Sequence, residues 1–426
     1  MYPNLYYVFK DWFRLELPFL KFINSFGFFV AISFLVAASL LAKELKRKSQ
    51  QGLLQPTETE ITVGEPASIA DLVSNFILGF VLGYKVLALF FLDSSATADP
   101  QAYIFSGKGN WLLGLLLGTG LAYWKWHEKG KEKLDKPEKR KVRLWPHDRV
   151  GEFTVLALVF GLVGAKLFDI FENWSDFLQR PSEYILSGGG LTFYGGLILA
   201  TIAIVVYARK YKIPLGHLAD AIAPPLMIAY AIGRIGCQVA GDGDWGIYNS
   251  AFQVDDNHEI TQTIQPFYKT VLTHADWFGT HYRNVNEIPH KSFSVSFLPK
   301  WLQAYDYPHN VNDVGVRLNG CDEPKYCNHL PAPVFPTPFY ETIMCTGLFF
   351  LLWVFRKRLK VPGTLFALYL IVNGIERFLI EQIRVNNKMD LFGLQPTQAE
   401  VIAVGLVITG IGIWIFLNNK YRTSLK

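Results

Sequence analysis

Long uncharged blocks of apolar residues recur along the chain, and short polar segments separate them. Each block approaches the roughly 20 residues that a helix needs to cross the hydrocarbon core of a bilayer. We interpret the following blocks as membrane-spanning helices: 22–42, 72–92, 109–124, 152–171, 190–208, 217–236, 341–356, 363–381 and 400–417. The pattern predicts an all-α, polytopic integral membrane protein with about nine transmembrane helices.

The composition supports this interpretation. Half of the 426 residues are hydrophobic and 15% are aromatic, whereas only 18% are charged. Soluble proteins carry roughly 25% charged residues. The composition excludes a disordered chain, a collagen, a disulfide-dense secreted module and a nucleic-acid-binding arm. We therefore expect contact with the lipid bilayer and none with nucleic acid.

Lysine and arginine are concentrated in every second connecting segment. Basic loops follow the first, third and seventh spans, at 43–48, 125–149 and 356–360, and the tail 418–426 is basic as well. By contrast, segment 237–338 has 11 acidic residues against six Lys/Arg. The positive-inside rule predicts that the N-terminus lies outside and the C-terminus inside. The first apolar block is too long for a signal peptide and should remain as an uncleaved anchor.

Several spans contain ionisable residues, which are costly in lipid and by default indicate a functional site. Lys166 and Asp169 lie three residues apart on one helical face, which predicts a buried ion pair. Asp220, near the inner end of the sixth span, is expected to satisfy a helix terminus. Arg234, near the outer end of the same span, has no acid one turn before it.

The eighth span carries the most charge. The spacing of Arg377, Glu381 and Arg384 places them on one helical face. They could form a self-neutralising ladder that holds two helices together. Alternatively, the guanidinium groups could bind an anionic head group, because a planar guanidinium binds phosphate through two parallel hydrogen bonds.

Two glycine-rich stretches occur near these charges, SGGGLTFYGGLILA (187–200) and GRIGCQVAGDGDWG (233–246). Glycines at such spacing can serve close helix packing, or they can bring backbone N–H groups to a phosphate. The second stretch joins Arg234 to an irregular, acid-containing loop. Irregular backbone at membrane depth is tolerated where it lines a cavity. The stretch therefore predicts a polar cavity that opens toward the outer leaflet.

Of the four cysteines, Cys237 and Cys345 fall near or within spans, whereas Cys321 and Cys327 lie in the outer segment. In the oxidising environment outside the cytoplasmic membrane, this second pair can form a disulfide. A zinc site is disfavoured, because no second Cys or His pair stands at ligand spacing.

Five motifs resemble those of the bacterial prolipoprotein diacylglyceryl transferases, in that family's order. The stretch 233–246 is similar to the signature Gly-Arg-hydrophobic-Gly-Asn-x-x-Asn-Gly-Glu-x-Trp-Gly. GGGLTFYGG resembles Gly-Gly-x-x-Phe-His-Gly-Gly, PTPFYE resembles Pro-Ser-Gln-Leu-Tyr-Glu, and ERFLIEQIR resembles Phe-Arg-x-x-x-Glu-x-x-Arg. LQPTQAEVIAV resembles the Gln-containing entry to the last helix.

The resemblance covers residues 150–417 and implies a seven-helix core. Under this interpretation the chain divides as follows: an interfacial segment 1–21, a first transmembrane helix 22–42, an additional helical hairpin with a basic cytoplasmic linker 68–149, the transferase-like core 150–417, a periplasmic insertion 247–335 within that core, and a cytoplasmic tail 418–426.

Such enzymes transfer a diacylglyceryl group from phosphatidylglycerol to the lipobox cysteine of a preprolipoprotein, forming a thioether and releasing glycerol phosphate. The resemblance implies this activity in the bacterial cytoplasmic (inner) membrane, with no cofactor and no metal. Its partners would be phosphatidylglycerol and preprolipoprotein signal peptides that carry the lipobox cysteine.

Residue by residue, the resemblance implies two groups of site residues. The catalytic group is Arg377, Glu381, Tyr194 and Asp244. The substrate-binding group is Arg234, Gly195, Gly196, Gly233, Gly236, Trp245, Gly246 and Arg384.

The chain departs from the family pattern at the candidate bases. Tyr194 stands where the family has His, Cys237 where it has Asn, and Asn373 and Phe26 where it has Tyr. The acid of the family signature corresponds to Asp242 or Asp244, because the loop that contains them is one residue longer than the family's loop. A phenol with a pKa of about 10 is a poor base unless nearby cations lower that pKa, so the identity of the general base stays open.

Two other functions fit a polytopic chain with buried arginines. One is a catalytically altered relative that binds an anionic phospholipid. The other is a small-solute transporter, although transporters tend to repeat a motif in both halves, and the glycine and arginine motifs occur once each here.

Overall fold

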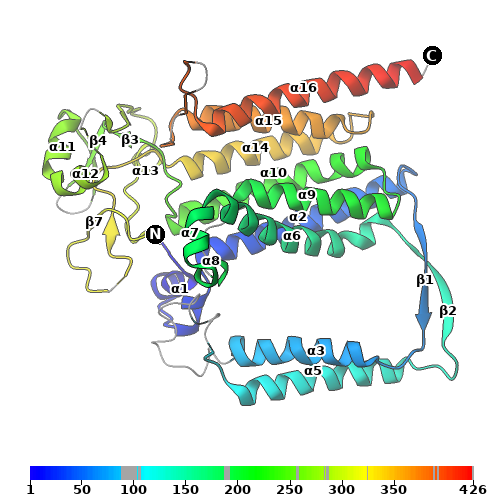
Figure 1. Cartoon of the computed structure of the whole chain (residues 1–426). Coiled ribbons are helices and arrows are strands. Elements are labelled where there is room, and N and C mark those ends of the chain that lie inside the picture. Colours follow the sequence, from blue (N-terminus) through cyan, green and yellow to red (C-terminus); the bar gives the residue numbers. More distant parts are fainter. Residues whose placement is uncertain are drawn as a thin grey trace. The chain divides into compact units, whose positions relative to one another are not determined.

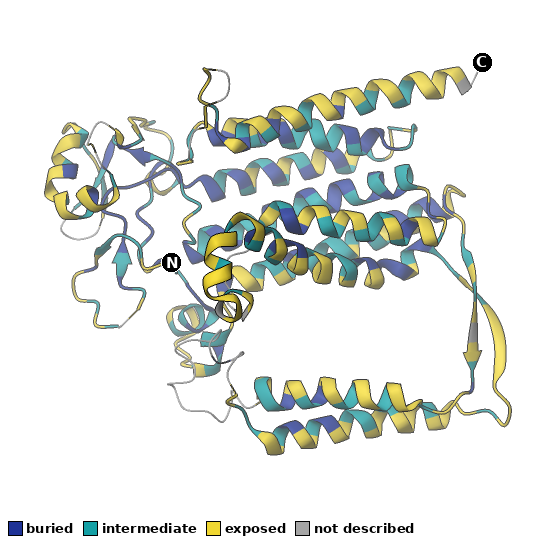
Figure 2. Cartoon of the chain, in the orientation of Figure 1, coloured by how far each residue is buried: buried dark blue, intermediate teal, exposed yellow. Residues whose placement is uncertain are grey.

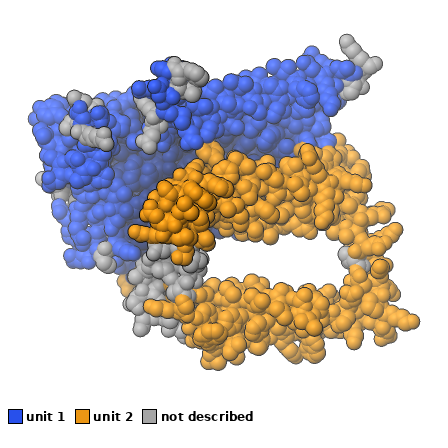
Figure 3. Space-filling view, in the orientation of Figure 1, with its two compact units in different colours: residues 1–13, 23–41, 216–426 blue, residues 14–22, 42–215 orange. Residues whose placement is uncertain are grey.

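The computed structural model describes residues 1–87, 103, 107–186, 192–255, 259–282, 284, 287–323, 325–386, 389–390 and 393–424. The chain forms two compact units, which Figure 3 distinguishes by colour. The first comprises residues 1–13, 23–41 and 216–426, and the second comprises residues 14–22 and 42–215. Each unit is treated by itself below.

The first unit is built mainly from long helices, labelled in Figure 1. Its helices are α1 (Leu5–Phe13), most of α2 (Ser25–Gln50), α10 (Leu215–Ala240), α11 (Phe267–Thr273), α12 (Ala275–His281), α13 (Lys300–Gln303), α14 (Thr337–Phe355), α15 (Thr364–Glu381) and α16 (Gln398–Ser424). Its short strands are β3 (Tyr248–Asn249), β4 (Phe252–Val254), β5 (Ile260–Gln262), β6 (His290–Lys291), β7 (Val316–Arg317) and β8 (Asn328–His329).

The second unit consists of helical pairs and one two-stranded ladder. Its elements are the 3₁₀ helix η1 (Pro18–Phe22), β1 (Thr57–Val63), α3 (Ile69–Val81), the π-helical turn η2 (Leu82–Val86), α5 (Trp111–Lys131), β2 (Glu138–Leu144), the 3₁₀ helix η4 (Pro146–Arg149), α6 (Val150–Glu172), α7 (Trp174–Gln179), α8 (Pro181–Leu186) and α9 (Phe193–Lys210).

Among the described residues, seven helices are long and apolar enough to cross a membrane: Ser25–Gln50, Ile69–Val86, Pro146–Glu172, Phe193–Lys210, Leu215–Ala240, Thr337–Phe355 and Gln398–Thr423. The other two predicted spans, 109–124 and 363–381, coincide with α5 and α15, and α15 carries three charged residues. The C-terminal part of span 72–92 and the first residues of span 190–208 lie outside the described residues. The predicted helical membrane protein is thus confirmed, while the count of nine spans stays a prediction.

Apolar packing and a helix cap join α10, α14 and α15 in the first unit. Met227, Cys345, Leu352 and Leu365 form a buried cluster between these helices. The carboxylate of Asp220 accepts hydrogen bonds from the backbone N–H groups of Gly363 (2.8 Å) and Phe366 (3.0 Å). The prediction that Asp220 satisfies a helix terminus is confirmed, and the terminus is that of α15, which is distant in sequence.

The segment between α10 and α14 has its own small core. Tyr248, Phe278, Tyr307 and Leu330 are among its buried members. The short strands of this segment form two-stranded sheets, β3–β6, β4–β5 and β7–β8. Cys321 and Cys327 form a disulfide, so the favoured interpretation of this pair is confirmed.

In the second unit, glycines allow close helix packing. A Cβ atom on Gly195 would lie 2.4 Å from the carbonyl oxygen of Gly164, and one on Gly196 would lie 2.7 Å from that of Gly161. These contacts lock α9 against α6. The predicted ion pair is present on α6, where Lys166 Nζ lies 3.7 Å from Asp169 Oδ2.

The ladder of β1 and β2 was not predicted, because the basic segment 125–149 reads as a solvated linker. Seven residues of each strand pair in antiparallel register. Acidic β1 faces basic β2, with Glu58 opposite Arg143 and Glu60 opposite Lys141, and opposite charges favour cross-strand pairing. On α3 and α5, by contrast, large apolar side chains such as Ile69 and Leu112 are exposed, as lipid-facing residues should be (Figure 2).

Candidate active site

The carboxylate of Glu341 lies at the centre of a buried cluster of charges in the first unit. Glu341 is on the first turns of α14, and its side chain is fully buried. Its oxygens lie 3.2 Å from Arg234 Nε, 3.4 Å from Arg377 Nη1 and 3.7 Å from Arg384 Nη1. The hydroxyl of Tyr230 donates a further hydrogen bond to it at 2.7 Å. One carboxylate of α14 thus joins an arginine of α10 to two arginines at and just beyond the end of α15.

Asp244 joins two of the same arginines from the other side. Its carboxylate is paired with Arg234, and its Oδ1 accepts a hydrogen bond from Arg384 Nη2 at 2.6 Å. Asp244 is more exposed, at 36% of its side chain, than either arginine, at 14% and 9%.

Arg377 is held in part by its own helix. Its Nη2 lies 3.7 Å from Glu381 Oε2, four residues along α15. Glu381 also accepts a hydrogen bond from Asn386 at 2.5 Å. The predicted ladder is therefore present between Arg377 and Glu381, whereas Arg384 lies beyond the end of α15 and pairs with Asp244 and Glu341 instead.

The loop after α10 brings Asp244 into place. Gly241 and Gly243 have φ angles of +64° and +100°, which residues with a side chain rarely adopt. The hydroxyl of Thr337 then donates a hydrogen bond to the carbonyl of Asp244 at 2.8 Å. Trp245 packs against Tyr307, with ring centroids 5.1 Å apart. The C-terminal end of the loop is thereby fixed.

Gly246 lies where the loop meets the chain beyond α15. Its N–H donates to the carbonyl of Phe335, and the next N–H, of Ile247, donates to the carbonyl of Ile383, both at 2.9 Å. This backbone pairing places Arg384 within hydrogen-bond distance of Asp244.

We expect Gly246→Ala to lower the stability of the protein. The new Cβ would lie 2.6 Å from the carbonyl oxygen of Ile383 and 2.9 Å from Thr337 Cγ2, and such overpacking costs about 1–3 kcal/mol. Gly233→Ala is the matched control, because nothing lies within 4 Å of the position of its Cβ. Thermal unfolding in detergent measures the difference, and equal melting temperatures would contradict the close contact at Gly246.

The two aspartates of this loop have opposite electrostatic environments. Burial raises the pKa of Asp242. Burial would also raise the pKa of Asp244, but the guanidinium groups of Arg234 and Arg384 outweigh it and hold that pKa below its usual value. Asp244, the aspartate that reaches the arginines, therefore ionises more readily than Asp242.

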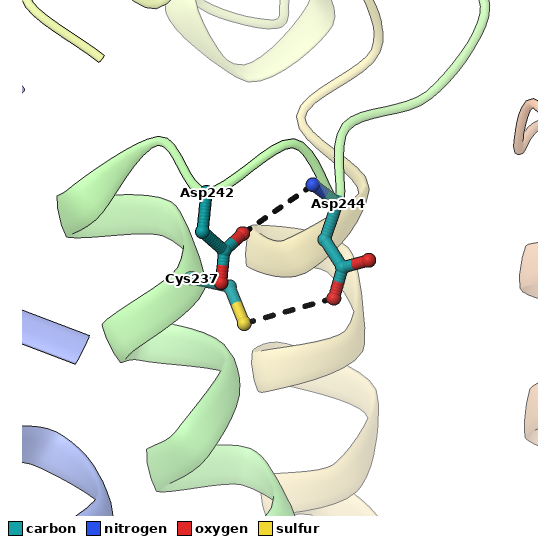
Figure 4. Close-up of side chains that lie close together, drawn as sticks. All are labelled: Cys237, Asp242 and Asp244. Carbon is teal, nitrogen blue, oxygen red and sulfur yellow. Dashed lines mark hydrogen bonds between the residues drawn. The ribbon is translucent and has the colours of Figure 1, made fainter. Parts of the chain in front are cut away.

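Cys237, Asp242 and Asp244 come close together beside this cluster (Figure 4). Their ligand atoms lie within 4.8 Å of one another, which would suit a metal ion by residue type. However, Arg234 Nη1 lies 3.7 Å from Cys237 Sγ and also pairs with Asp244. A guanidinium at this distance repels a cation, so the arrangement disfavours a metal ion.

The remaining predicted residues fall in two places. Gly236 packs against α2, where its Cβ would lie 3.0 Å from that of Phe29. Tyr194, Gly195 and Gly196 belong to the second unit. The structure gives these two glycines a packing role against α6, and the proposed contacts of all three with a head group stay predictions.

The predicted site omits two residues that the structure places in it, Glu341 and Tyr230. Glu341 ends the motif PTPFYE, and a lone acid at the start of an apolar helix was the signal that could have identified it. Tyr230 precedes Arg234 by one helical turn, and the guanidinium lies 5.0 Å from the centre of its ring. An aromatic residue at that spacing on an apolar helix carries no signal of its own.

Comparison with known proteins agrees with these motifs. The family model for prolipoprotein diacylglyceryl transferase matches residues 110–416. The phosphatidylglycerol–prolipoprotein diacylglyceryl transferase of Clostridium novyi is 27% identical over 335 residues, covering 77% of this chain and 99% of the relative. The proteins of the same name from Dehalococcoides mccartyi and Clostridioides difficile are each 25% identical, over 280 and 281 residues, covering 66% of this chain and 81% and 82% of the relatives. Because the family match covers well over half of this chain, the chain belongs to the prolipoprotein diacylglyceryl transferase family.

Proposed function

We propose that this protein transfers a diacylglyceryl group from phosphatidylglycerol to the lipobox cysteine of preprolipoproteins. The observation that carries the proposal is the convergence of Arg234, Arg377 and Arg384 on the Glu341 carboxylate. Three guanidinium groups that converge from α10 and from the end of α15 suit a phosphate group attached to lipid. The names of the relatives supply the reaction.

In the proposed reaction, the thiol of the acceptor loses its proton, and its sulfur attacks the carbon of the diacylglyceryl group that carries the phosphate. The carbon–oxygen bond breaks, a thioether forms, and glycerol phosphate departs with the electron pair, while the thiol proton passes to the solvent or to the departing phosphate. Arg234 and Arg377 stabilise the charge on the departing phosphate, because fixed cations lower the energy of a developing anion. Glu341 and Glu381 hold the arginines in position.

Transfer can be measured with purified protein, labelled phosphatidylglycerol and a peptide that contains the lipobox cysteine. We expect label on the cysteine and release of glycerol phosphate. Binding of the lipid without transfer would indicate the catalytically altered relative, and absence of both would refute the proposal.

Tyr194 is the proposed base or hydrogen-bond donor to the head group, since it stands where the family has histidine. Tyr194→Phe should lower turnover by about ten- to a thousandfold, which is the scale of lost acid–base assistance. Tyr268→Phe, at an exposed position of the insertion, is the control. Unchanged turnover in Tyr194→Phe would show that the ring serves packing, because phenylalanine keeps the ring and loses only the hydroxyl.

We further propose that the N-terminus and the insertion 247–335 lie outside the cytoplasmic membrane, with the basic loops inside. In intact cells, a membrane-impermeant maleimide should label Lys269→Cys and leave Lys131→Cys unlabelled. Both positions are exposed, and the free cysteines Cys237 and Cys345 are buried. Equal labelling of the two variants would refute this orientation.

A further inference from the structure

One loop of the insertion exposes large apolar side chains. Phe293, Phe297 and Trp301 are 41%, 83% and 52% exposed. Residues 288–305 contain no acidic residue, although the surrounding segment 237–338 is rich in acids. Such a patch on a membrane protein calls for a partner that covers it.

Contacts with α14 fix the height of this loop relative to the membrane. The ring of Trp301 packs edge-on against Phe339, with centroids 5.3 Å apart. The hydroxyl of Tyr340 donates a hydrogen bond to the carbonyl of Leu302 at 2.6 Å. Phe339 and Tyr340 are in the first turn of α14, a helix that is long and apolar enough to cross a membrane. The loop therefore lies beside the end of a candidate membrane helix.

The backbone of the loop is already paired within the protein. The buried amide of Gln303 accepts from the N–H of Val295 at 2.7 Å and donates to the carbonyls of Val295 and Leu298 at 3.0 and 2.7 Å. Asn249 is also buried, and its amide donates to the carbonyl of Phe293 at 2.8 Å and accepts from that residue's N–H at 3.1 Å. Backbone groups that enter lipid must be satisfied in this way.

We propose that loop 293–301 docks into the bilayer interface beside α14. The side chains of Phe297 and Trp301 contact the acyl chains just below the head groups, where aromatic residues are favoured. Lys291 and Lys300, both exposed at the ends of the loop, reach the lipid phosphates. This lipid-binding surface depends on α14 being a membrane helix and is independent of the transfer reaction.

The full chain, reconstituted into vesicles of phosphatidylcholine and phosphatidylglycerol, provides the test. An environment-sensitive fluorophore is attached at Phe297→Cys, and at Lys269→Cys on α11 as the matched control. The native free cysteines do not compete, because both are buried. Nitroxide-labelled lipids should quench the fluorophore at 297 several-fold more than at 269, and aqueous iodide should do the reverse.

Two results would overturn the proposal. Accessibility to iodide at 297, equal to that at 269, would mean that the loop lies in water. Protection from iodide without quenching by lipid nitroxides would mean that a protein covers the loop. Phe297→Ser checks the fold separately: its melting temperature should equal that of the parent, because the side chain is exposed.

Discussion

Arg234→Lys and Arg377→Lys should each lower the rate of diacylglyceryl transfer by about ten- to a hundredfold or more, since a charge-assisted hydrogen bond contributes roughly 1.5–3 kcal/mol. Lysine keeps the charge but loses the planar pair of donors that matches a phosphate. Both guanidinium groups contact Glu341, from two different helices, so each variant removes part of one site. Initial rates at saturating acceptor peptide measure the effect.

Arg422→Lys is the matched control, because Arg422 is exposed near the end of α16, and its rate should be unchanged. The alternative is that Arg377 serves only the ladder with Glu381. In that case Arg377→Gln would destabilise the protein, and the double variant Arg377→Gln with Glu381→Gln would recover stability and transfer together. Full transfer by the double variant would refute the role of Arg377 in binding phosphate.

Glu341→Gln should lower the free energy of unfolding by about 3–5 kcal/mol, the usual cost of removing one partner of a buried ion pair. Glutamine has the same shape and can still accept the hydrogen bond from Tyr230, but it lacks the charge that offsets Arg234, Arg377 and Arg384. The arginines would then repel one another and lose their common position. Transfer should therefore fall together with the melting temperature in detergent.

Glu287→Gln is the control for the chemistry of the substitution, since Glu287 is exposed in the insertion. Its melting temperature and rate should match those of the parent protein. A loss of transfer by Glu341→Gln at an unchanged melting temperature would contradict the structural role of Glu341 and would point to direct contact with the substrate.

The helical membrane architecture was predictable from the sequence because the bilayer imposes a simple requirement. A spanning segment must pair its backbone internally and expose apolar side chains, and both conditions are visible as uncharged blocks. The same requirement makes charged residues within spans conspicuous, so Arg234, Arg377 and Glu381 stand out in the sequence itself. The Asp220 cap and the Lys166–Asp169 pair follow from the same cost of burying charge.

The ladder of β1 and β2 and the interface loop 293–301 of the insertion were not predictable in this way. In the sequence, α3, η2 and α5 lie between the two strands. The charged sequences of the strands resemble solvated linkers until opposite charges are placed across a ladder. In loop 293–301, the side chain of Gln303 pairs the loop backbone from within, and Phe297 is exposed. Such pairings depend on long-range register, which hydropathy does not encode.

The sequence by itself determined that this chain spans a membrane, and its motifs indicated the family and the three arginines. Only the tertiary structure decided how those arginines are neutralised. Arg234 has no acid within one turn of it on α10, and its partners are Glu341 from α14 and Asp244 from the loop after α10. A buried carboxylate can serve three guanidinium groups only where separate helices converge, and that convergence is a property of packing rather than of spacing along one helix.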